Sequence, residues 1–167
     1  RMDLNLLEPF WKEYIEACDE DTKKTMLAKY NKVLSLQPGN PAPTFTFTSI
    51  EGKHVSLSDF TVKLVYLDFW ASVCGPCLIH IPSANDLKHD FEGKDVVFLY
   101  VSLDEDEKSW KKMIKDKELT GVQLLAKGFK HDVPQSYNVS GIPSYFVIDR
   151  KGNIYNNNAP RPSSDDE

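Results

Sequence analysis

Hydrophobic and polar positions along the 167-residue chain follow a helical period at first and a strand period after about residue 40. In residues 3–36 apolar side chains recur every three or four positions, which predicts two consecutive helices with an apolar stripe. The second helix can be capped by Asp19, Asp21 or Thr22. The apolar positions are Leu4, Leu7, Trp11, Tyr14, Ile15 and Cys18 in the first helix, and Met26, Leu27, Tyr30, Val33 and Leu34 in the second.

A boundary follows at residues 37–43, whose three prolines and one glycine are typical of a linker rather than a helix. We therefore expect an N-terminal helical extension over residues 1–40 and a second domain over residues 41–167. In that second part the apolar residues alternate with polar ones or form short runs. Strands are expected at residues 44–48, 55–57, 63–70, 95–103, 122–125, 145–149 and 154–155.

The arrangement of these strands predicts the fold class. The first two are joined by a turn at residues 51–53, which favours a hairpin. Residues 63–70 and 95–103 are nearly all apolar, as in strands buried on both faces of a mixed or parallel sheet. Helices are expected between the strands, at residues 74–91 with a kink or interruption at Pro82, at residues 107–117 as a charged, exposed helix, and as a turn at residues 133–138. Strands alternating with helices predict an α/β domain with crossovers.

Composition and charge exclude several classes of protein. Lys and Arg number 20 and Asp and Glu 25, a net charge of −5 that argues against nucleic acid as the main partner. No apolar run approaches the ~18 residues of a membrane-spanning helix. The chain begins at Arg1 and ends where Ser163 and the following acids would start a helix, so we expect a processed or excised chain whose C-terminal helix is truncated.

Three cysteines are too few, and odd in number, to staple a small domain. Cys18 falls on the apolar stripe of the first helix, where we expect a buried, inert thiol. The other two form the sequence Cys74-Gly75-Pro76-Cys77, directly after a buried strand and at the head of a helix. A helix N-terminus stabilises a thiolate, and the spacing lets the second sulfur attack a mixed disulfide formed by the first.

This placement predicts Cys74 as the exposed nucleophile and Cys77 as the more buried resolving thiol. Gly75 would let a substrate backbone approach, and Pro76 limits the geometry of the helix start. Zinc is disfavoured because no second cysteine pair exists and His80 would supply only a third ligand. Haem attachment needs a histidine where Leu78 stands. A purely structural disulfide remains open.

Asp68 is the only acid within residues 64–70, a strand predicted to be buried on both faces. An unpaired carboxylate there is costly and has a raised pKa, which suggests a function. The alternative is a structural role, with Asp68 paired with Lys63 or bonded to the backbone. Trp70, at the end of the same strand, is either core packing or a platform for substrate.

Residues 67–77, Leu-Asp-Phe-Trp-Ala-Ser-Val-Cys-Gly-Pro-Cys, resemble the active-site run of thioredoxin-fold oxidoreductases. Residues 41–45 leading to 57–60, with residues 137–149 later, are similar to the TlpA-like (ResA-like) branch, and the likeness spans about residues 41–162. It implies a central sheet flanked by helices and thiol–disulfide exchange with protein partners in the bacterial periplasm. It also implies that Asp68 accepts the proton of Cys77, that neither an organic cofactor nor a metal is needed, and that a membrane-bound redox partner recycles the dithiol.

In the family the proline matching Pro143 is cis and faces the dithiol, and Ile142 before it would dock the substrate main chain. The alternative is an ordinary trans proline at a strand start. The chain departs from the pattern at Val73, where the family commonly has Trp, and at His80, where ResA-like proteins tend to carry Glu. We treat His80 as a candidate pH-responsive neighbour of the dithiol, against the alternative of a solvent-facing or core histidine.

The function predicted from these features is a thiol-disulfide oxidoreductase acting outside the cytoplasm, with a lean towards reduction because thioredoxin has the same Gly-Pro between its cysteines. A peroxiredoxin-like peroxidase is disfavoured, since position 71 is Ala rather than Thr or Ser and the only arginines are Arg1, Arg150 and Arg161. A non-catalytic binding module that uses the groove at Pro143 is the third alternative.

Overall fold

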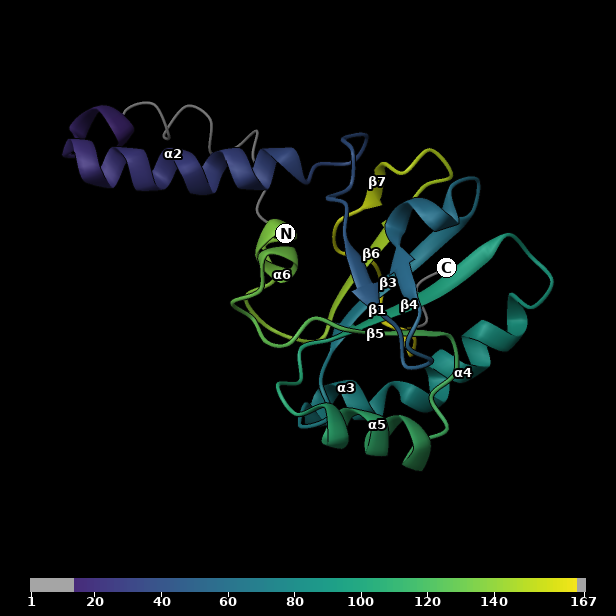
Figure 1. The fold of residues 1–167 in the computed structure, drawn as a ribbon. Helices are drawn as coiled ribbons and strands as arrows, with labels where there is room; N and C mark the ends of the chain where they lie inside the picture. The colour runs from purple at the N-terminus through teal and green to yellow at the C-terminus, as the bar shows by residue number, and fades with distance from the viewer. Residues whose placement is uncertain (1–13, 165–167) are drawn as a thin grey trace. The chain divides into compact units, whose positions relative to one another are not determined.

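The computed structural model describes residues 14–164, which divide into two compact units at residues 35 and 36 (Figure 1). In the first unit residues 14–17 are helical and α2 spans Glu20–Ser35. Asp19 caps α2 as predicted, because its carboxylate accepts hydrogen bonds from the Thr22 amide at 2.9 Å and the Thr22 hydroxyl at 2.7 Å.

The prediction of a buried thiol in this unit is wrong, since Cys18 is only half-buried. No residue of α2 is buried either, so the apolar stripe of this helix is not enclosed. Leu4, Leu7 and Trp11, which belong to the apolar stripe predicted for the first helix, lie outside the described residues.

The second unit is built on a five-stranded mixed sheet in the order β5-β4-β3-β6-β7. β3, β4 and β5 are parallel, while β6 and β7 run antiparallel to their neighbours. The bounds are β3 Leu64–Trp70, β4 Val96–Ser102, β5 Val122–Leu125, β6 Ser144–Ile148 and β7 Ile154–Asn156. The nearly all-apolar run at residues 64–70 thus becomes the central strand, as expected for a strand covered on both faces.

The predicted hairpin is formed by β1 Thr46–Thr48 and β2 His54–Ser56, and a short 3-10 helix at Leu57–Phe60 follows it. Phe47 of β1 is buried in the core cluster on one side of the sheet, together with Tyr137 after α6 (Asp132–Ser136). An isolated bridge between Ser49 and Leu124 joins the end of the hairpin to β5.

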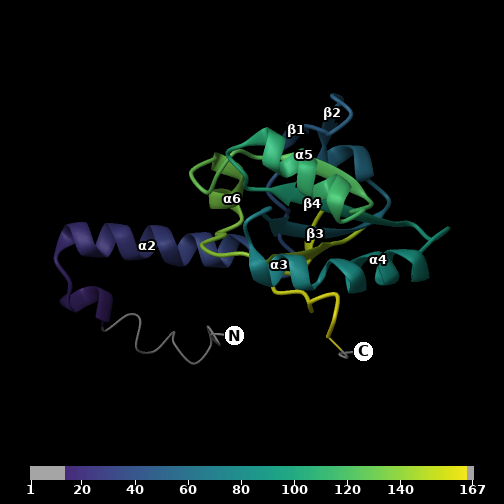
Figure 2. The ribbon, with the colours of Figure 1, turned by 90° about the horizontal axis from the view of Figure 1, so that it is seen from below.

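The helices that cover the other core cluster are α3 Gly75–Ile79, α4 Ile81–Asp90 and α5 Glu107–Asp116. All three lie in the lower part of Figure 1, and Figure 2 shows α3 and α4 following one another, with α5 apart from them. The predicted interruption near Pro82 is confirmed, and it falls at His80. Pro82 occupies the first turn of α4, where a missing amide costs no helical hydrogen bond.

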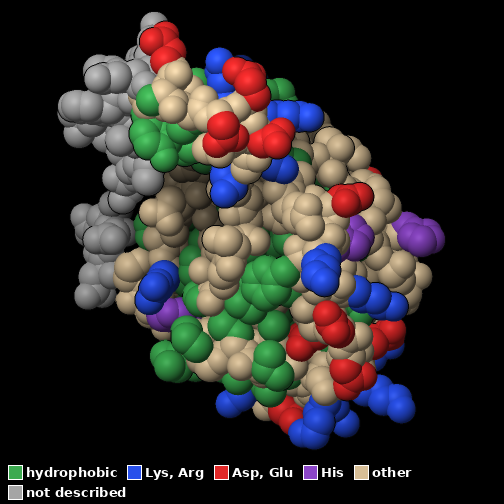
Figure 3. Space-filling model, turned by 90° about the vertical axis from the view of Figure 1, so that its left-hand side faces the viewer, with side chains coloured by type: hydrophobic (Ala, Val, Ile, Leu, Met, Phe, Trp, Pro, Cys, Tyr) green, Lys and Arg blue, Asp and Glu red, His purple; other side chains and the backbone are tan. Residues whose placement is uncertain are grey.

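The prediction of an exposed helix at residues 107–117 is only half right. The helix is present and Asp106 caps it, but Trp110 and Ile114 are buried at a four-residue spacing. One face of α5 therefore packs on the sheet while its charged residues stay in solvent. On the face shown in Figure 3, hydrophobic side chains gather in the lower half, with acidic and basic side chains around them.

Within residues 14–164, no helix is both long and apolar enough to cross a membrane. The expected start of a C-terminal helix is a turn at residues 162 and 163, and residues 165–167 lie outside the described residues.

Gly121→Ala should destabilise the second unit by about 2–4 kcal/mol. Gly121 has φ +99°, and a Cβ atom would lie 2.8 Å from the Tyr100 ring and 2.9 Å from the Phe98 carbonyl oxygen. The control is Gly52→Ala, which has φ +78° but no atom within 4 Å of the added Cβ, and should cost about 1 kcal/mol. Urea unfolding with the disulfide intact measures both, and equal losses would refute the steric argument.

Candidate functional site

The two cysteines of the Cys-Gly-Pro-Cys segment form a disulfide at the start of α3, with 5.2 Å between their Cα atoms. Cys74 is the N-cap of α3, and its Sγ accepts a hydrogen bond from the Cys77 amide at 3.2 Å. The sulfur thus lies at the positive end of the helix, where a thiolate would be stabilised.

Both cysteines are shielded in this disulfide form. Cys74 is 9% exposed and Cys77 is 5% exposed, so the predicted order holds but Cys74 is not an exposed residue. The reason is that its sulfur lies against the first turn of α3 rather than in solvent. The surface around the disulfide is instead formed by Val73 and Ile79, which are 88% and 74% exposed, with Gly75 and Pro76 between them.

The Ile142–Pro143 peptide bond is cis, as the family likeness implied. Ser144, which follows it, pairs with Phe69 of β3, so the cis bond lies at the end of the sheet from which the chain runs on to Cys74. Ile142 is half-buried and packs against both core clusters. The cis peptide and the dithiol therefore come from two loops at one end of the sheet.

Asp68 lies in the middle of the central strand, where its register partners are Tyr100 on β4 and Tyr145 on β6. It is 8% exposed, and burial raises its pKa to about 8. Among the ion pairs of the described residues none involves Asp68 or Lys63, and Asp68 Oδ1 has no protein hydrogen-bond partner. The structural alternative that pairs Asp68 with Lys63 is therefore wrong.

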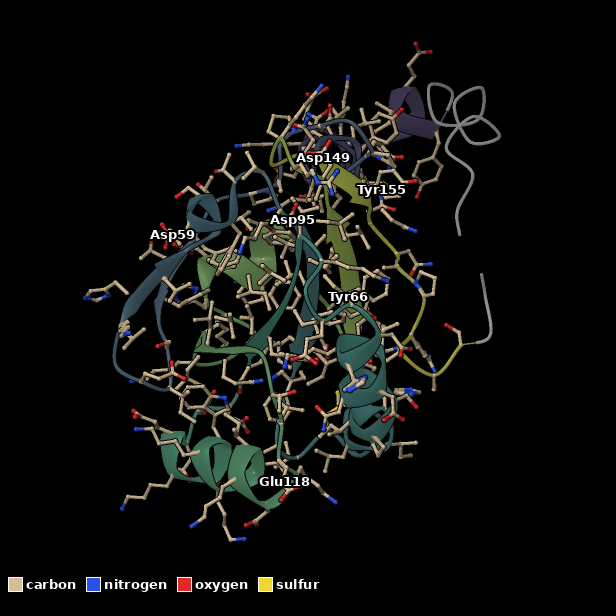
Figure 4. All side chains as sticks on the ribbon, turned by 90° about the vertical axis from the view of Figure 1, so that its right-hand side faces the viewer. Asp59, Tyr66, Asp95, Glu118, Asp149 and Tyr155 are labelled. Carbon is tan, nitrogen blue, oxygen red and sulfur yellow. A yellow bond between two sulfur atoms is a disulfide. The ribbon has the colours of Figure 1, made fainter. Side chains whose placement is uncertain are left out.

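Three tyrosines surround this carboxyl group. Burial, and then the charge of Asp68, raises the pKa of Tyr66, Tyr100 and Tyr145, so all three are neutral hydroxyls. Tyr66 donates to the Pro160 carbonyl at 2.8 Å, and in Figure 4 the segment that follows Tyr155 passes beside it.

A small cavity of about 10 Å³ connects Asp68 with Cys77. It is lined by Asp68, Trp70, Cys77, His80, Ile81, Ala84, Tyr100 and Leu119. His80 is half-buried, and its Nδ1 lies 2.7 Å from the hydroxyl of Ser163. Trp70 is 2% exposed, which favours the core-packing alternative, so we assign it no substrate contact.

Sequence reasoning missed a second buried acid, Asp104, behind the loop that leads to Cys74. Its carboxylate accepts the Ser72 amide at 2.9 and 3.1 Å, the Ser72 hydroxyl at 2.6 Å and the Ser102 hydroxyl at 2.6 Å. An acid directly after a buried strand was the available signal, since the ends of β3 and β4 meet at one edge of the sheet. Asp104 thus fixes the backbone two residues before the dithiol.

No cluster of three or more His, Cys, Asp or Glu side chains within residues 14–164 is arranged to hold a metal ion. The arrangement can support thiol–disulfide exchange, because it combines a cysteine pair at a helix N-terminus with a buried proton acceptor.

Comparison with known proteins points to the same chemistry. The pattern of the Redoxin family matches residues 37–167. A thiol-disulfide oxidoreductase ResA from Bacillus cereus is 31% identical over 125 residues, which cover 75% of this chain and 71% of the relative. The solved thioredoxin domain of a thiol-disulfide oxidoreductase from Bacteroides vulgatus is 33% identical with a TM-score of 0.71, over 76% of this chain and 91% of that one. A thiol:disulfide interchange protein from Bacteroides sp. is 34% identical with a TM-score of 0.66, over 73% and 81%.

The burial of Asp68 predicts a stability that falls as pH rises. The pKa of Asp68 is about 8 in the folded state and 3.8 ordinarily, so the folded state holds the proton more tightly. The free energy of unfolding therefore falls as the pH rises from about 4 to about 8. Asp68→Asn should match the wild type near pH 4 and exceed its free energy of unfolding by several kcal/mol at pH 9. Urea unfolding of the oxidised proteins tests this, with the exposed Asp86→Asn as control. A difference that stays constant with pH would contradict it.

Asp104→Ala should slow attack by Cys74 about tenfold, because Ser72 loses the acceptor that holds its amide and hydroxyl. It should also lower the free energy of unfolding by about 2–4 kcal/mol. Both are measured on the reduced protein, the first by reaction with 5,5′-dithiobis(2-nitrobenzoate). The control is Asp106→Ala, which removes an exposed helix cap on the same loop and should leave the rate unchanged. Equal rates for the two variants would rule out the positioning role.

Proposed function

The chain belongs to the Redoxin family and to its ResA-like thiol-disulfide oxidoreductases, and from that premise we propose that Cys74 and Cys77 reduce disulfides of protein substrates outside the cytoplasm. The observation that carries the assignment of residues is the disulfide at the N-terminus of α3 beside a cavity that also contains a buried acid. Neither a metal nor an organic cofactor takes part in the proposed reaction.

Cys74 is the nucleophile in this proposal. Its thiolate attacks a substrate disulfide, forms a mixed disulfide and releases one substrate sulfur as a thiolate. The N-terminus of α3 and the Cys77 amide favour the anionic form of Cys74. The highly exposed Val73 beside it allows a partner surface to approach.

Cys77 then resolves the mixed disulfide. It must lose its proton to attack, and Asp68 lines the same cavity and can accept that proton. A pKa of about 8 suits this role, because both the charged and the neutral carboxyl are accessible near neutral pH. The products are the Cys74–Cys77 disulfide and the second substrate thiol.

The substrate main chain is proposed to bind along Ile142 and the cis Pro143, next to the surface of Gly75 and Pro76. Pairing with the backbone of Ile142 would recognise an extended segment without demanding a particular side chain. The surroundings of the dithiol carry no formal charge from Trp70 to Ile79, which favours partners with apolar residues near the disulfide.

The proposed direction of exchange and the proposed location of the protein outside the cytoplasm rest on its similarity to thioredoxin and to the ResA-like branch. Gly and Pro separate the cysteines as in thioredoxin, a reductant with a potential of about −270 mV. The ResA-like branch supports a site outside the cytoplasm, where a membrane-bound redox partner would return the disulfide to the dithiol. Oligomeric state plays no part in the proposed reaction.

The proposal is tested with insulin as a defined disulfide substrate and with Cys18→Ser as the background. Reduced wild type should accelerate insulin reduction by dithiothreitol. Cys77→Ser should accumulate a mixed disulfide between Cys74 and insulin, visible by non-reducing electrophoresis and mass spectrometry, because the resolving thiol is missing. Cys74→Ser should form no such adduct. An adduct in Cys74→Ser but not in Cys77→Ser would reverse the roles, and none in either would defeat the proposal.

A further inference from the structure

Three residues that line the cavity beside Cys77 carry buried polar atoms that the two-step exchange does not explain. Its volume of about 10 Å³ is enough for about one water molecule. Within the described residues, Asp68 Oδ1, Trp70 Nε1 and Tyr100 OH are buried without a protein hydrogen-bond partner. All three side chains line this one cavity.

Three unsatisfied polar atoms on residues around one cavity need a physical reason, since each unsatisfied buried polar group costs about 1–3 kcal/mol. The three atoms are complementary. Oδ1 of an ionised Asp68 accepts, the indole Nε1 of Trp70 donates, and the hydroxyl of Tyr100 does either. A water molecule held between them would be satisfied, and it would link the buried carboxylate to whatever else faces the cavity.

His80 is the other titratable side chain that faces this space besides Asp68, Cys77 and Tyr100. It sits at the break between α3 and α4, where it ends the first helix and starts the second. Unlike the three buried groups it is half exposed, so it touches both the cavity and solvent.

The C-terminal segment holds this histidine in place. The Ser163 hydroxyl lies 2.7 Å from His80 Nδ1, and the same segment is tied to the sheet through Ala159 and through Pro160, the acceptor of Tyr66. When Nδ1–H donates to the Ser163 hydroxyl oxygen, the neutral ring keeps an unprotonated Nε2 that can accept a proton; when the ring is protonated, both nitrogens donate. With Nδ1 held by Ser163, Nε2 is the ring nitrogen that can accept and release a proton.

We propose that His80 relays the proton between the buried Asp68 and solvent, with the Tyr100 hydroxyl fixing the path through the cavity and Ser163 fixing the imidazole. This inference rests on the proposed function, in which Asp68 takes the proton from Cys77. It adds the route by which that proton reaches solvent. Asp68 is buried in the central strand and needs such a route to release the proton.

The step balances as follows. Cys77–SH gives its proton to the Asp68 carboxylate, and the Cys77 sulfur attacks the Cys74 mixed disulfide. The Cys74–Cys77 bond forms, the bond to the substrate sulfur breaks, and the substrate leaves as a thiolate. The proton on Asp68 then passes to Nε2 of His80, which loses a proton to solvent. When the Cys74–Cys77 disulfide is reduced again, the same path delivers a proton to Cys77.

Few titratable or charged groups lie near this path. β3 contributes Asp68, α3 contributes Cys77 and β4 contributes Tyr100, whereas α4 and the loop before β5 present only Ile81, Ala84 and Leu119. The C-terminal segment carries Arg161 two residues before Ser163. In the described residues no carboxylate other than Asp68 lines the cavity, so Asp68 and His80 form the acid–base pair of this path.

The test separates attack from resolution with 5,5′-dithiobis(2-nitrobenzoate). With Cys18→Ser as the background, reduced protein releases one coloured thiolate when Cys74 attacks, at a rate set by reagent concentration, and a second when Cys77 resolves, at a rate independent of it. His80→Ala should leave the first phase unchanged and slow the second at least about tenfold. Added imidazole should restore the second phase in proportion to its concentration, and substituted imidazoles should do so in order of their basicity.

Matched variants separate a relay from a merely structural role. His89→Ala, on an exposed position of α4, should match the wild type in both phases and show no response to imidazole. Ser163→Ala and Tyr100→Phe should each slow the second phase several-fold without altering the first. A second phase of His80→Ala that equals the wild type, or one that is slow but unaffected by every imidazole, would overturn the relay.

The same assay distinguishes failure of the relay from failure of the proposed function. Asp68→Asn should slow the second phase, and imidazole should not restore it because the buried acceptor itself is missing. If Asp68→Asn resolves at the wild-type rate, the role of Asp68 in the proposed function is wrong. If Asp68→Asn is slow while His80→Ala is normal, only the relay is wrong.

Discussion

The burial of one carboxyl group in the central strand is the constraint on which the site depends. Asp68 lies between Tyr100 and Tyr145 on the neighbouring strands, and no ion pair among the described residues compensates its charge. A sheet buried on both faces would be more stable with an apolar residue there. The neutral tyrosines and the small cavity leave the acid able to change its protonation state, which is what its proposed role as proton acceptor of Cys77 requires.

A second buried acid shows what a purely structural carboxylate looks like in the same molecule. Asp104 accepts hydrogen bonds from Ser72 and Ser102 and so joins the ends of β3 and β4. Its lone pairs are used, whereas Oδ1 of Asp68 is not. The contrast separates a group that holds the loop before Cys74 from a group that is available for proton transfer.

Much of the fold follows from local patterns. The apolar run at 64–70 predicted a strand buried on both faces, and the proline at 82 predicted a break in the helix after the dithiol. Asp19, which caps α2, was one of three candidate caps. Local patterns failed where exposure depends on distant neighbours. Cys18 is half-buried although it lies on an apolar stripe, and Cys74 is shielded by its own helix start.

The sequence by itself determined the succession of strands and helices along the chain, the dithiol at a helix start and the acid in a buried strand. Each of these depends on residues that are close together in the sequence. Only the tertiary structure decided which distant groups meet. Ser72 reaches Asp104 across 32 positions, and His80 reaches Ser163 across 83. Such contacts arise when crossovers bring strand ends and the C-terminal segment to one edge of the sheet, and no local periodicity encodes them.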